Sequence, residues 1–179
     1  MSGKTQALIL IAALGAGAGG LWASHAWFGL NPPPGSLAIG APAIDFELPT
    51  LDGAMQRRSQ ALGRVQVINF WAPWCAPCRR EIPVLQALGK EFGAQHVEIL
   101  GVALDEPEAV RKFAGEMAID YPIMLASFSD FALMRAFGND RDALPFTVIV
   151  DRQGRLHTRK LGEYHEPELR ADIESALKR

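Results

Sequence analysis

Apolar runs alternate with amphipathic segments along most of the chain. The apolar runs are rich in β-branched and aromatic residues and predict buried strands at Ile44 to Leu48, Val65 to Trp71, Val97 to Leu104, Tyr121 to Leu125 and Phe146 to Asp151. The amphipathic segments predict helices at Ala76 to Phe92, Pro107 to Met117, Asp130 to Phe137 and Glu166 to Leu177. Gln153-Gly154 turns the chain into Arg155 to Leu161, which predicts a hairpin with the strand before it. This order predicts an α/β fold with a central mixed sheet flanked by helices.

The first thirty residues form an apolar leader. Lys4 precedes an uncharged run from Thr5 to Ser24 that is rich in Ala, Leu, Ile and Gly. A positive start before an apolar stretch is typical of an export signal, and roughly 20 such residues span a bilayer as a helix. Trp22 and Trp27 near its outer end favour the membrane interface. We expect residues 1–30 to be a single-pass anchor that places the rest of the chain in the periplasm.

A cleaved signal peptide is the alternative to an anchor, because Ser24-His25-Ala26 offers a small-x-small cleavage site. Both interpretations export the rest of the chain. Residues 31–38 contain three consecutive prolines and predict a stiff linker. The remaining residues, 39–179, are long enough for one domain with its own core.

Composition narrows the class of partner. The net charge is −2 and the basic residues are scattered, which gives no indication of a nucleic-acid partner. The chain has two cysteines, Cys75 and Cys78, and a bridge between them closes a very short loop. Such a bridge constrains the unfolded chain little and would therefore stabilise the fold little, so a chemical role for the pair is favoured.

The two cysteines lie where a predicted buried strand turns into a helix, in the segment Trp74-Cys75-Ala76-Pro77-Cys78. A cysteine at a helix N-terminus faces unpaired backbone N–H groups and the positive end of the helix dipole, which favour thiolate over thiol. The thiolate is the attacking species in disulfide exchange. We therefore expect Cys75 to be the nucleophile and Cys78, one turn further and more buried, to resolve the mixed disulfide.

Other uses of a Cys-x-x-Cys pair fit the sequence less well. A zinc site wants about four ligands, and neither a second cysteine pair nor a suitably spaced histidine pair is present. Attachment of a c-type haem needs histidine after the second cysteine, where this chain has Arg79. A copper-carrying module stays open, because thiolates suit Cu(I). A peroxide-reducing enzyme is a third class, but it needs a Thr-x-x-Cys nucleophile that is missing here. We predict no metal site and no cofactor.

The stretches VINFWAPWCAPCRREIPVLQAL and LPFTVIVDRQG resemble the thioredoxin superfamily. Within it, the chain is most similar to the membrane-anchored periplasmic disulfide reductases of the TlpA/ResA type, from about Ile39 to the C-terminus. The resemblance implies a thioredoxin fold and the reduction of disulfides in exported proteins, often during cytochrome c maturation or metal-centre assembly. It also implies a membrane thiol donor that resupplies electrons.

The resemblance also assigns a proton carrier. Cytosolic thioredoxins carry a buried aspartate six residues before the first cysteine, where this chain has Asn69, which cannot act as a base. In the reductase branch a glutamate three residues past the second cysteine takes over, and here it is Glu81. The i to i+3 spacing puts Glu81 on the same helix face as Cys78. A carboxylate in a partly apolar pocket should titrate high, as a proton shuttle requires.

The remaining expected site residues form a contact surface for substrate. Pro145 matches the family's cis-proline, so the Leu144–Pro145 bond is expected to be cis and the Leu144 backbone to pair with an extended substrate segment. Trp74 is expected to line the same surface, and Pro77 to preorganise the turn between the cysteines. Residues 126–129 and 139–143 depart from the family pattern and leave the shape of the partner surface open.

Overall fold

The computed structural model describes residues 36–127 and 130–179. The chain divides into two units, Met1–Pro34 and Gly35–Arg179, and the structure described below is that of the second. The predicted anchor, residues 1–30, and most of the predicted linker lie outside the described residues. Among the residues that are described, no helix has the length and apolarity needed to cross a membrane.

A five-stranded mixed sheet forms the centre of the domain. Its strands are β3 (Val65–Trp71), β4 (Val97–Leu104), β5 (Ile123–Ala126), β6 (Phe146–Val150) and β7 (Leu156–Leu161), in the spatial order β5-β4-β3-β6-β7. The β3, β4 and β5 strands are parallel, whereas β6 and β7 run antiparallel to their neighbours. Every residue of β3 and β6 is buried, which explains why both appear in the sequence as mainly apolar runs. The predicted mixed sheet and terminal hairpin are confirmed.

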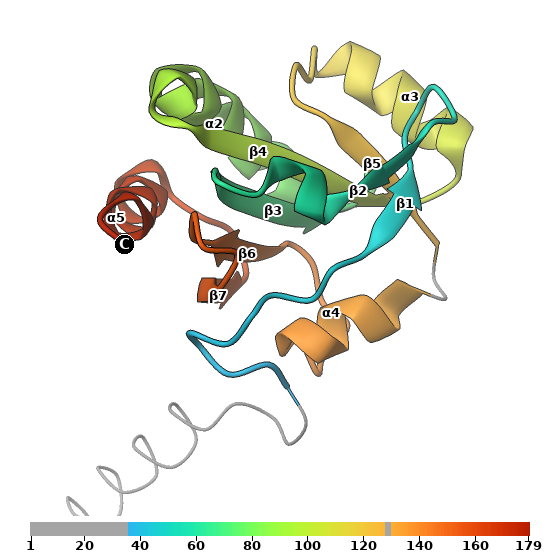
Figure 1. Cartoon of the computed structure of the whole chain (residues 1–179). Coiled ribbons are helices and arrows are strands. Elements are labelled where there is room, and N and C mark those ends of the chain that lie inside the picture. Colours follow the sequence, from blue (N-terminus) through green and yellow to red (C-terminus); the bar gives the residue numbers. More distant parts are fainter. Residues whose placement is uncertain (1–35, 128–129) are drawn as a thin grey trace, which may run out of the picture. The chain divides into compact units, whose positions relative to one another are not determined.

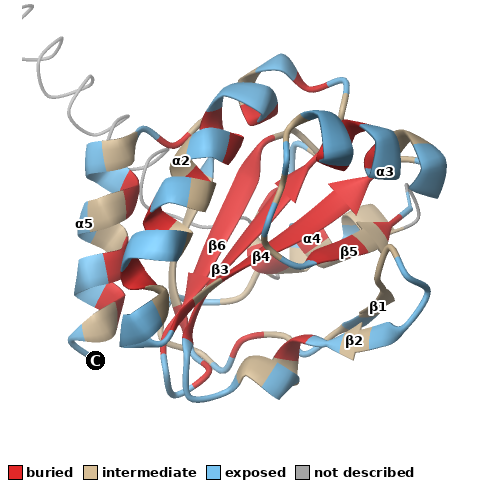
Figure 2. Cartoon of the chain, turned by 90° about the horizontal axis from the view of Figure 1, so that it is seen from above, coloured by how far each residue is buried: buried red, intermediate tan, exposed pale blue. Residues whose placement is uncertain are grey.

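Helices cover both faces of this sheet. They are α2 (Ala76–Phe92), α3 (Pro107–Glu116), α4 (Phe131–Phe137) and α5 (Glu166–Leu177), with a short 3₁₀ turn, η2 (Gly93–Gln95), after α2. Figure 1 shows α4 on the opposite side of the sheet from α2 and α3. Apolar residues of α2 and α5 share one core cluster with β3, and residues of α4 share another with the opposite face. Figure 2 shows the strands as the buried layer and the outer helix faces as exposed.

The segment before β3 differs from the prediction. The expected strand Ile44 to Leu48 is instead β1 (Glu47–Pro49), which pairs with β2 (Met55–Arg57), and a 3₁₀ turn, η1 (Arg58–Ala61), follows. Ile44 and Phe46 pack against the core without joining a strand ladder. Because β2 is short and polar, it carries no apolar alternation that would have predicted it. The strand expected from Tyr121 begins at Ile123, where its pairing with β4 starts.

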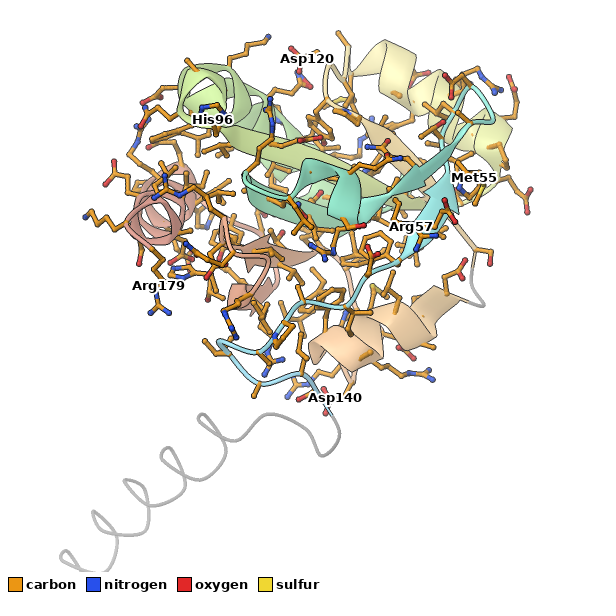
Figure 3. The ribbon with its side chains drawn as sticks, viewed as in Figure 1. Met55, Arg57, His96, Asp120, Asp140 and Arg179 are labelled. Atoms are coloured by element: carbon orange, nitrogen blue, oxygen red, sulfur yellow. A yellow bond between two sulfur atoms is a disulfide. The ribbon has the colours of Figure 1, made fainter. Side chains whose placement is uncertain are left out.

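Arg58 joins the leading segment to the sheet. Its side chain is buried, and its guanidinium donates to the carbonyl of Ile44 at 2.9 Å and to Gln66 Oε1 at 3.2 Å. The neighbouring Arg57, labelled in Figure 3, is half exposed and forms ion pairs with Asp45 and Glu47. The two adjacent arginines therefore occupy opposite environments.

We expect Arg58→Ala to lower the free energy of unfolding by about 2–3 kcal/mol, because it leaves buried acceptors without a donor. Arg57→Ala is the matched control and should cost less than about 1 kcal/mol, since exposed ion pairs contribute little. Urea unfolding of the full chain measures both values. Equal midpoints for the two variants would contradict this role of Arg58.

Candidate active site

Cys75 and Cys78 form a disulfide at the N-terminus of α2. The buried β3 strand delivers the chain to this point, and a turn closed by the Cys75 N–H and the Ala72 carbonyl at 3.1 Å leads into the helix. Cys75 is the N-cap of α2, and its Sγ accepts a hydrogen bond from the Cys78 backbone N–H at 3.3 Å. A thiolate at Cys75 in the reduced protein would receive the same N–H and the positive end of the helix dipole.

The two cysteines differ in exposure. Cys75 keeps 5% of its surface exposed, whereas Cys78 keeps none. This order agrees with the prediction that Cys78 is the more buried sulfur. Around them lies an apolar cluster that includes Trp71 and Ile82 as well as residues of α3. A second protein can therefore reach this pair only from the Cys75 side.

Glu81 lies one turn beyond Cys78 on the same helix, and its side chain is 1% exposed. Its Oε1 accepts a hydrogen bond from Asn69 Nδ2 at 2.5 Å, and its Oε2 accepts one from the Tyr164 backbone N–H at 2.9 Å. Asn69 Nδ2 also donates to Thr147 Oγ1 at 2.9 Å. The carboxylate is thus held between β3, α2 and the segment that precedes α5.

The environment of Glu81 favours its protonated form. The pKa of Glu81 is raised from 4.5 to about 7, chiefly by burial, and the negative charge of Glu163 contributes to the increase. The hydrogen bonds from Tyr164 and Asn69 and the charge of Lys160 act in the opposite direction, but the loss of solvation outweighs them. A carboxyl group that titrates near neutrality can take up or give a proton during a reaction at this pH. The expectation of a high pKa agrees with this structure.

The expected contact residues gather near the disulfide to different degrees. Trp74 is 61% exposed, an unusual position for a large aromatic side chain. Leu144 is partly buried and packs against the cluster that contains both cysteines. The Leu144–Pro145 bond is cis, as the resemblance implied. Pro77 occupies the first turn of α2, where its missing N–H costs nothing. Trp74 and Leu144 therefore provide apolar surface beside the sulfurs.

The sequence analysis assigned no role to the two hydrogen-bond partners of Glu81, Asn69 and Tyr164, or to Thr147, which accepts from Asn69. Asn69 appeared there only as a residue unable to act as a base, while Thr147 and Tyr164 did not appear. Asn69 and Thr147 are polar residues in strands whose every residue is buried, and a polar side chain in such a strand needs a buried hydrogen-bond partner. Tyr164 contributes through its backbone, so its side chain gives no signal.

Metal-binding side chains do not assemble into a site in the described part of the chain. No group of three or more histidine, cysteine, aspartate or glutamate residues within 36–127 and 130–179 is placed to hold an ion. The two sulfurs have Glu81 as a neighbour along α2, and its two carboxylate oxygens already accept hydrogen bonds from Asn69 and Tyr164. The reactive groups of this arrangement are the sulfurs of Cys75 and Cys78 and the carboxyl group of Glu81.

Known sequences that resemble this chain are thioredoxin-like proteins that include named thiol-disulfide oxidoreductases. A model of the AhpC/TSA family matches residues 39–159. The thiol-disulfide oxidoreductase ResA of Geobacillus thermodenitrificans is 32% identical over 141 residues, which covers 78% of this chain and 79% of that protein. ResA of Bacillus subtilis is 30% identical over 122 residues, with 68% and 66% covered.

Solved structures share the architecture. A putative thiol:disulfide interchange protein DsbE from Chlorobium tepidum superimposes with a TM-score of 0.72 at 26% identity, and the match covers 79% of this chain and 99% of that one. A putative thioredoxin from Neisseria meningitidis gives a TM-score of 0.66 at 27% identity, over 78% and 91% of the two chains. The mixed sheet with helices on both faces is therefore a thioredoxin-like fold.

Proposed function

The chain belongs to the AhpC/TSA family of thioredoxin-like proteins and is a thiol:disulfide oxidoreductase, and from this we propose its mechanism and its class of substrate. It acts as a reductase of disulfides in exported proteins, of the kind needed in cytochrome c maturation or metal-centre assembly. The observation that supports this most directly is the position of Cys75, whose sulfur caps α2 and is the more exposed of the pair.

The reaction takes two steps at sulfur. The Cys75 thiolate attacks one sulfur of the substrate disulfide, which forms a mixed disulfide and releases the other substrate sulfur as a thiolate. Cys78 then loses its proton and attacks the Cys75 sulfur. This forms the Cys75–Cys78 disulfide and releases the second substrate thiolate. Two electrons pass from the dithiol to the substrate, and the oxidised product has the disulfide found in this structure.

Glu81 accepts the proton of Cys78. Cys78 is fully buried and has no exposure through which solvent could take the proton. Glu81 is three residues further along α2 and has a pKa of about 7, so it is partly ionised at neutral pH. A base with a pKa near the working pH is efficient in proton transfer. In this proposal Trp74, Pro77, Leu144 and Pro145 hold the substrate segment beside Cys75.

The proposal also covers how the Cys75–Cys78 pair is reduced again and where in the cell the domain lies. Each cycle consumes the dithiol, so a second dithiol must reduce the Cys75–Cys78 disulfide, and we assign this step to a membrane thiol donor. Residues 1–30 anchor the chain in the inner membrane with the domain in the periplasm. The roughly 20-residue apolar run after Lys4 supports this location.

The trapping variant Cys78→Ala tests the direction and the substrate. It should accumulate mixed disulfides with exported proteins, because the first attack proceeds and nothing resolves the intermediate. Non-reducing electrophoresis followed by mass spectrometry identifies the trapped partners. The double variant with Cys75→Ser and Cys78→Ala is the control and should trap nothing. Adducts that survive in the double variant, or none in the single variant, would refute the proposed order of attack.

A further inference from the structure

Three buried polar atoms near Glu81 have no hydrogen-bond partner among the described residues. They are Asn69 Oδ1, Trp71 Nε1 and Tyr121 Oη. Unpartnered polar atoms are costly in a protein interior, and those in native structures are satisfied by protein groups or by ordered water. Their positions relative to one another therefore indicate whether a single partner could serve all three.

The amide oxygen of Asn69 faces β4. On β3, Asn69 lies between Thr147 of β6 and Gly101 of β4, and the three residues are in register. Its amide nitrogen donates to Thr147 on the β6 side as well as to Glu81. Because the oxygen and nitrogen of an amide diverge from the same carbon, the oxygen is directed to the other side, over Gly101.

Trp71 and Tyr121 converge on the same place. A Cβ atom at Gly101 would lie 2.8 Å from Trp71 Nε1 and 3.0 Å from the Tyr121 ring atom next to the one that bears the hydroxyl. Trp71 is two residues after Asn69 on β3, so both side chains are on one face of the sheet. The missing side chain at position 101 thus lets the Trp71 indole nitrogen and the Tyr121 ring approach the backbone there, beside the strand position of Asn69.

The donors and acceptors at this point are complementary to one water molecule. The indole N–H of Trp71 is a donor only. Burial raises the pKa of the Tyr121 hydroxyl and the charge of Glu81 raises it further, so this hydroxyl stays protonated and can donate. Asn69 Oδ1 and the ionised carboxylate of Glu81 accept. A water that accepts two hydrogen bonds and donates two would satisfy all four groups, and buried waters make roughly two to four such bonds.

We propose that Asn69, Trp71 and Tyr121 form a buried water site above Gly101, and that Tyr121 is a positioning residue that directs this water toward Glu81. The inference deepens the proposed function, because it assigns a further hydrogen-bond donor to the group that receives the Cys78 proton. With the Tyr121 hydroxyl donating to it, the water must point its own hydrogens at Asn69 Oδ1 and at the Glu81 carboxylate. The ionised form of Glu81 is stabilised by this hydrogen bond.

Several other groups act on Glu81 and must be kept constant in a test. From β7 and the segment before α5 these are Lys160, Glu163 and the Tyr164 backbone. On its own helix, Cys78 and Arg80 are close in sequence, and Arg80 is paired with Glu163. On the β5 side, Asp120, which is labelled in Figure 3, precedes Tyr121 and forms an ion pair with Lys90 of α2 at 2.7 Å. The oxidised protein removes the cysteines from the titration, because disulfide sulfurs bind no protons.

Tyr121→Phe in the oxidised full chain tests the site without relying on reductase activity. Glutamate labelled with ¹³C at the carboxyl carbon, assigned by comparison with Glu81→Gln, reports the titration of Glu81 by NMR. We expect Tyr121→Phe to raise the midpoint of Glu81 by roughly half a pKa unit or more, because one donor that orients the water is lost. Tyr164→Phe is the matched control and should leave the midpoint in place, since its hydroxyl donates to Asp172 at 2.6 Å and its backbone N–H is kept.

The water itself is detected through the Trp71 indole N–H, which should show a slow-water NOE in wild type. The cross-peak should persist in Tyr121→Phe, where no hydroxyl proton can relay the signal and three partners still hold the water. An unchanged Glu81 midpoint, or an equal shift in Tyr164→Phe, would overturn the role of Tyr121. A shifted midpoint with no water cross-peak in Tyr121→Phe would instead indicate a direct bond from Tyr121 to Glu81 and would overturn the water site. Neither the Glu81 titration nor the water NOE depends on reductase activity, so both measurements test the water site even if the proposed reductase function is wrong.

Discussion

Cys75→Ser is expected to abolish disulfide reduction, lowering kcat/KM with a protein disulfide such as insulin by at least about 10³-fold. A serine hydroxyl is not ionised near neutral pH, so the variant has no nucleophile at the one of its two cysteine positions that has exposed surface. The remaining Cys78 is fully buried and cannot reach a substrate disulfide. Steady-state reduction followed by turbidity or by thiol release measures the loss.

The loss in Cys75→Ser can be separated from misfolding. Serine is among the favoured N-cap residues, so its oxygen replaces the sulfur as acceptor for the Cys78 N–H and α2 keeps its cap. The variant should therefore unfold at a urea concentration close to that of the reduced wild type. Cys78→Ser is the matched control, because it should still form a mixed disulfide at a measurable rate. Substantial turnover by Cys75→Ser would exclude Cys75 as the nucleophile.

The sequence predicted three elements of the fold, β3, β4 and α2, to the residue. The bounds of β3, β4 and α2 agree with the prediction because long apolar or amphipathic runs determine them locally. The β1-β2 hairpin could not be predicted in this way. The β2 strand has three residues, Met-Gln-Arg, and it forms because Arg58 and the Phe46 carbonyl fix the chain beside it. Its pairing is thus a consequence of tertiary contacts.

The two reactive cysteines could be predicted from the sequence, but the surroundings of the proton carrier Glu81 could be predicted only in part. The Cys-x-x-Cys spacing at a strand-to-helix junction is a local pattern, and Glu81 follows from helical spacing and the family resemblance. Its hydrogen-bond partners come from elsewhere, since Tyr164 is 83 residues away and Thr147 is 78 residues from Asn69. Contacts at such separations depend on the strand order and not on any local pattern. The same holds for Gly101 and Tyr121, whose meeting with Trp71 requires β4 and β5 to be in place.

Glu81→Gln is expected to slow disulfide reduction at pH 7 by about a hundredfold, the usual contribution of a proton-transfer group. In wild type the rate should rise with pH through about 7 as Glu81 ionises and becomes able to accept the Cys78 proton. The glutamine variant lacks this ionisation, so its rate should rise only at the higher pH at which the thiols ionise unaided. A pH–rate profile of both proteins measures the difference. An unchanged profile would make Glu81 a buried structural group without a part in the reaction.

The same substitution should change how stability depends on pH in the oxidised protein. Because folding raises the pKa of Glu81 from 4.5 to about 7, the folded state holds a proton that the unfolded state has released between these values. The free energy of unfolding of wild type therefore falls as pH rises through this window, by on the order of 3 kcal/mol for this group. Glu81→Gln removes that dependence, so its stability relative to wild type should increase by the same amount from pH 4 to pH 8.

Urea unfolding across this pH range measures the difference in stability. Glu91→Gln is the control, since Glu91 is an exposed carboxylate on α2 that pairs with Arg170. Parallel curves for wild type and Glu81→Gln would mean that Glu81 ionises as easily in the folded chain as in water, and it would then be a poor match for the proton of Cys78.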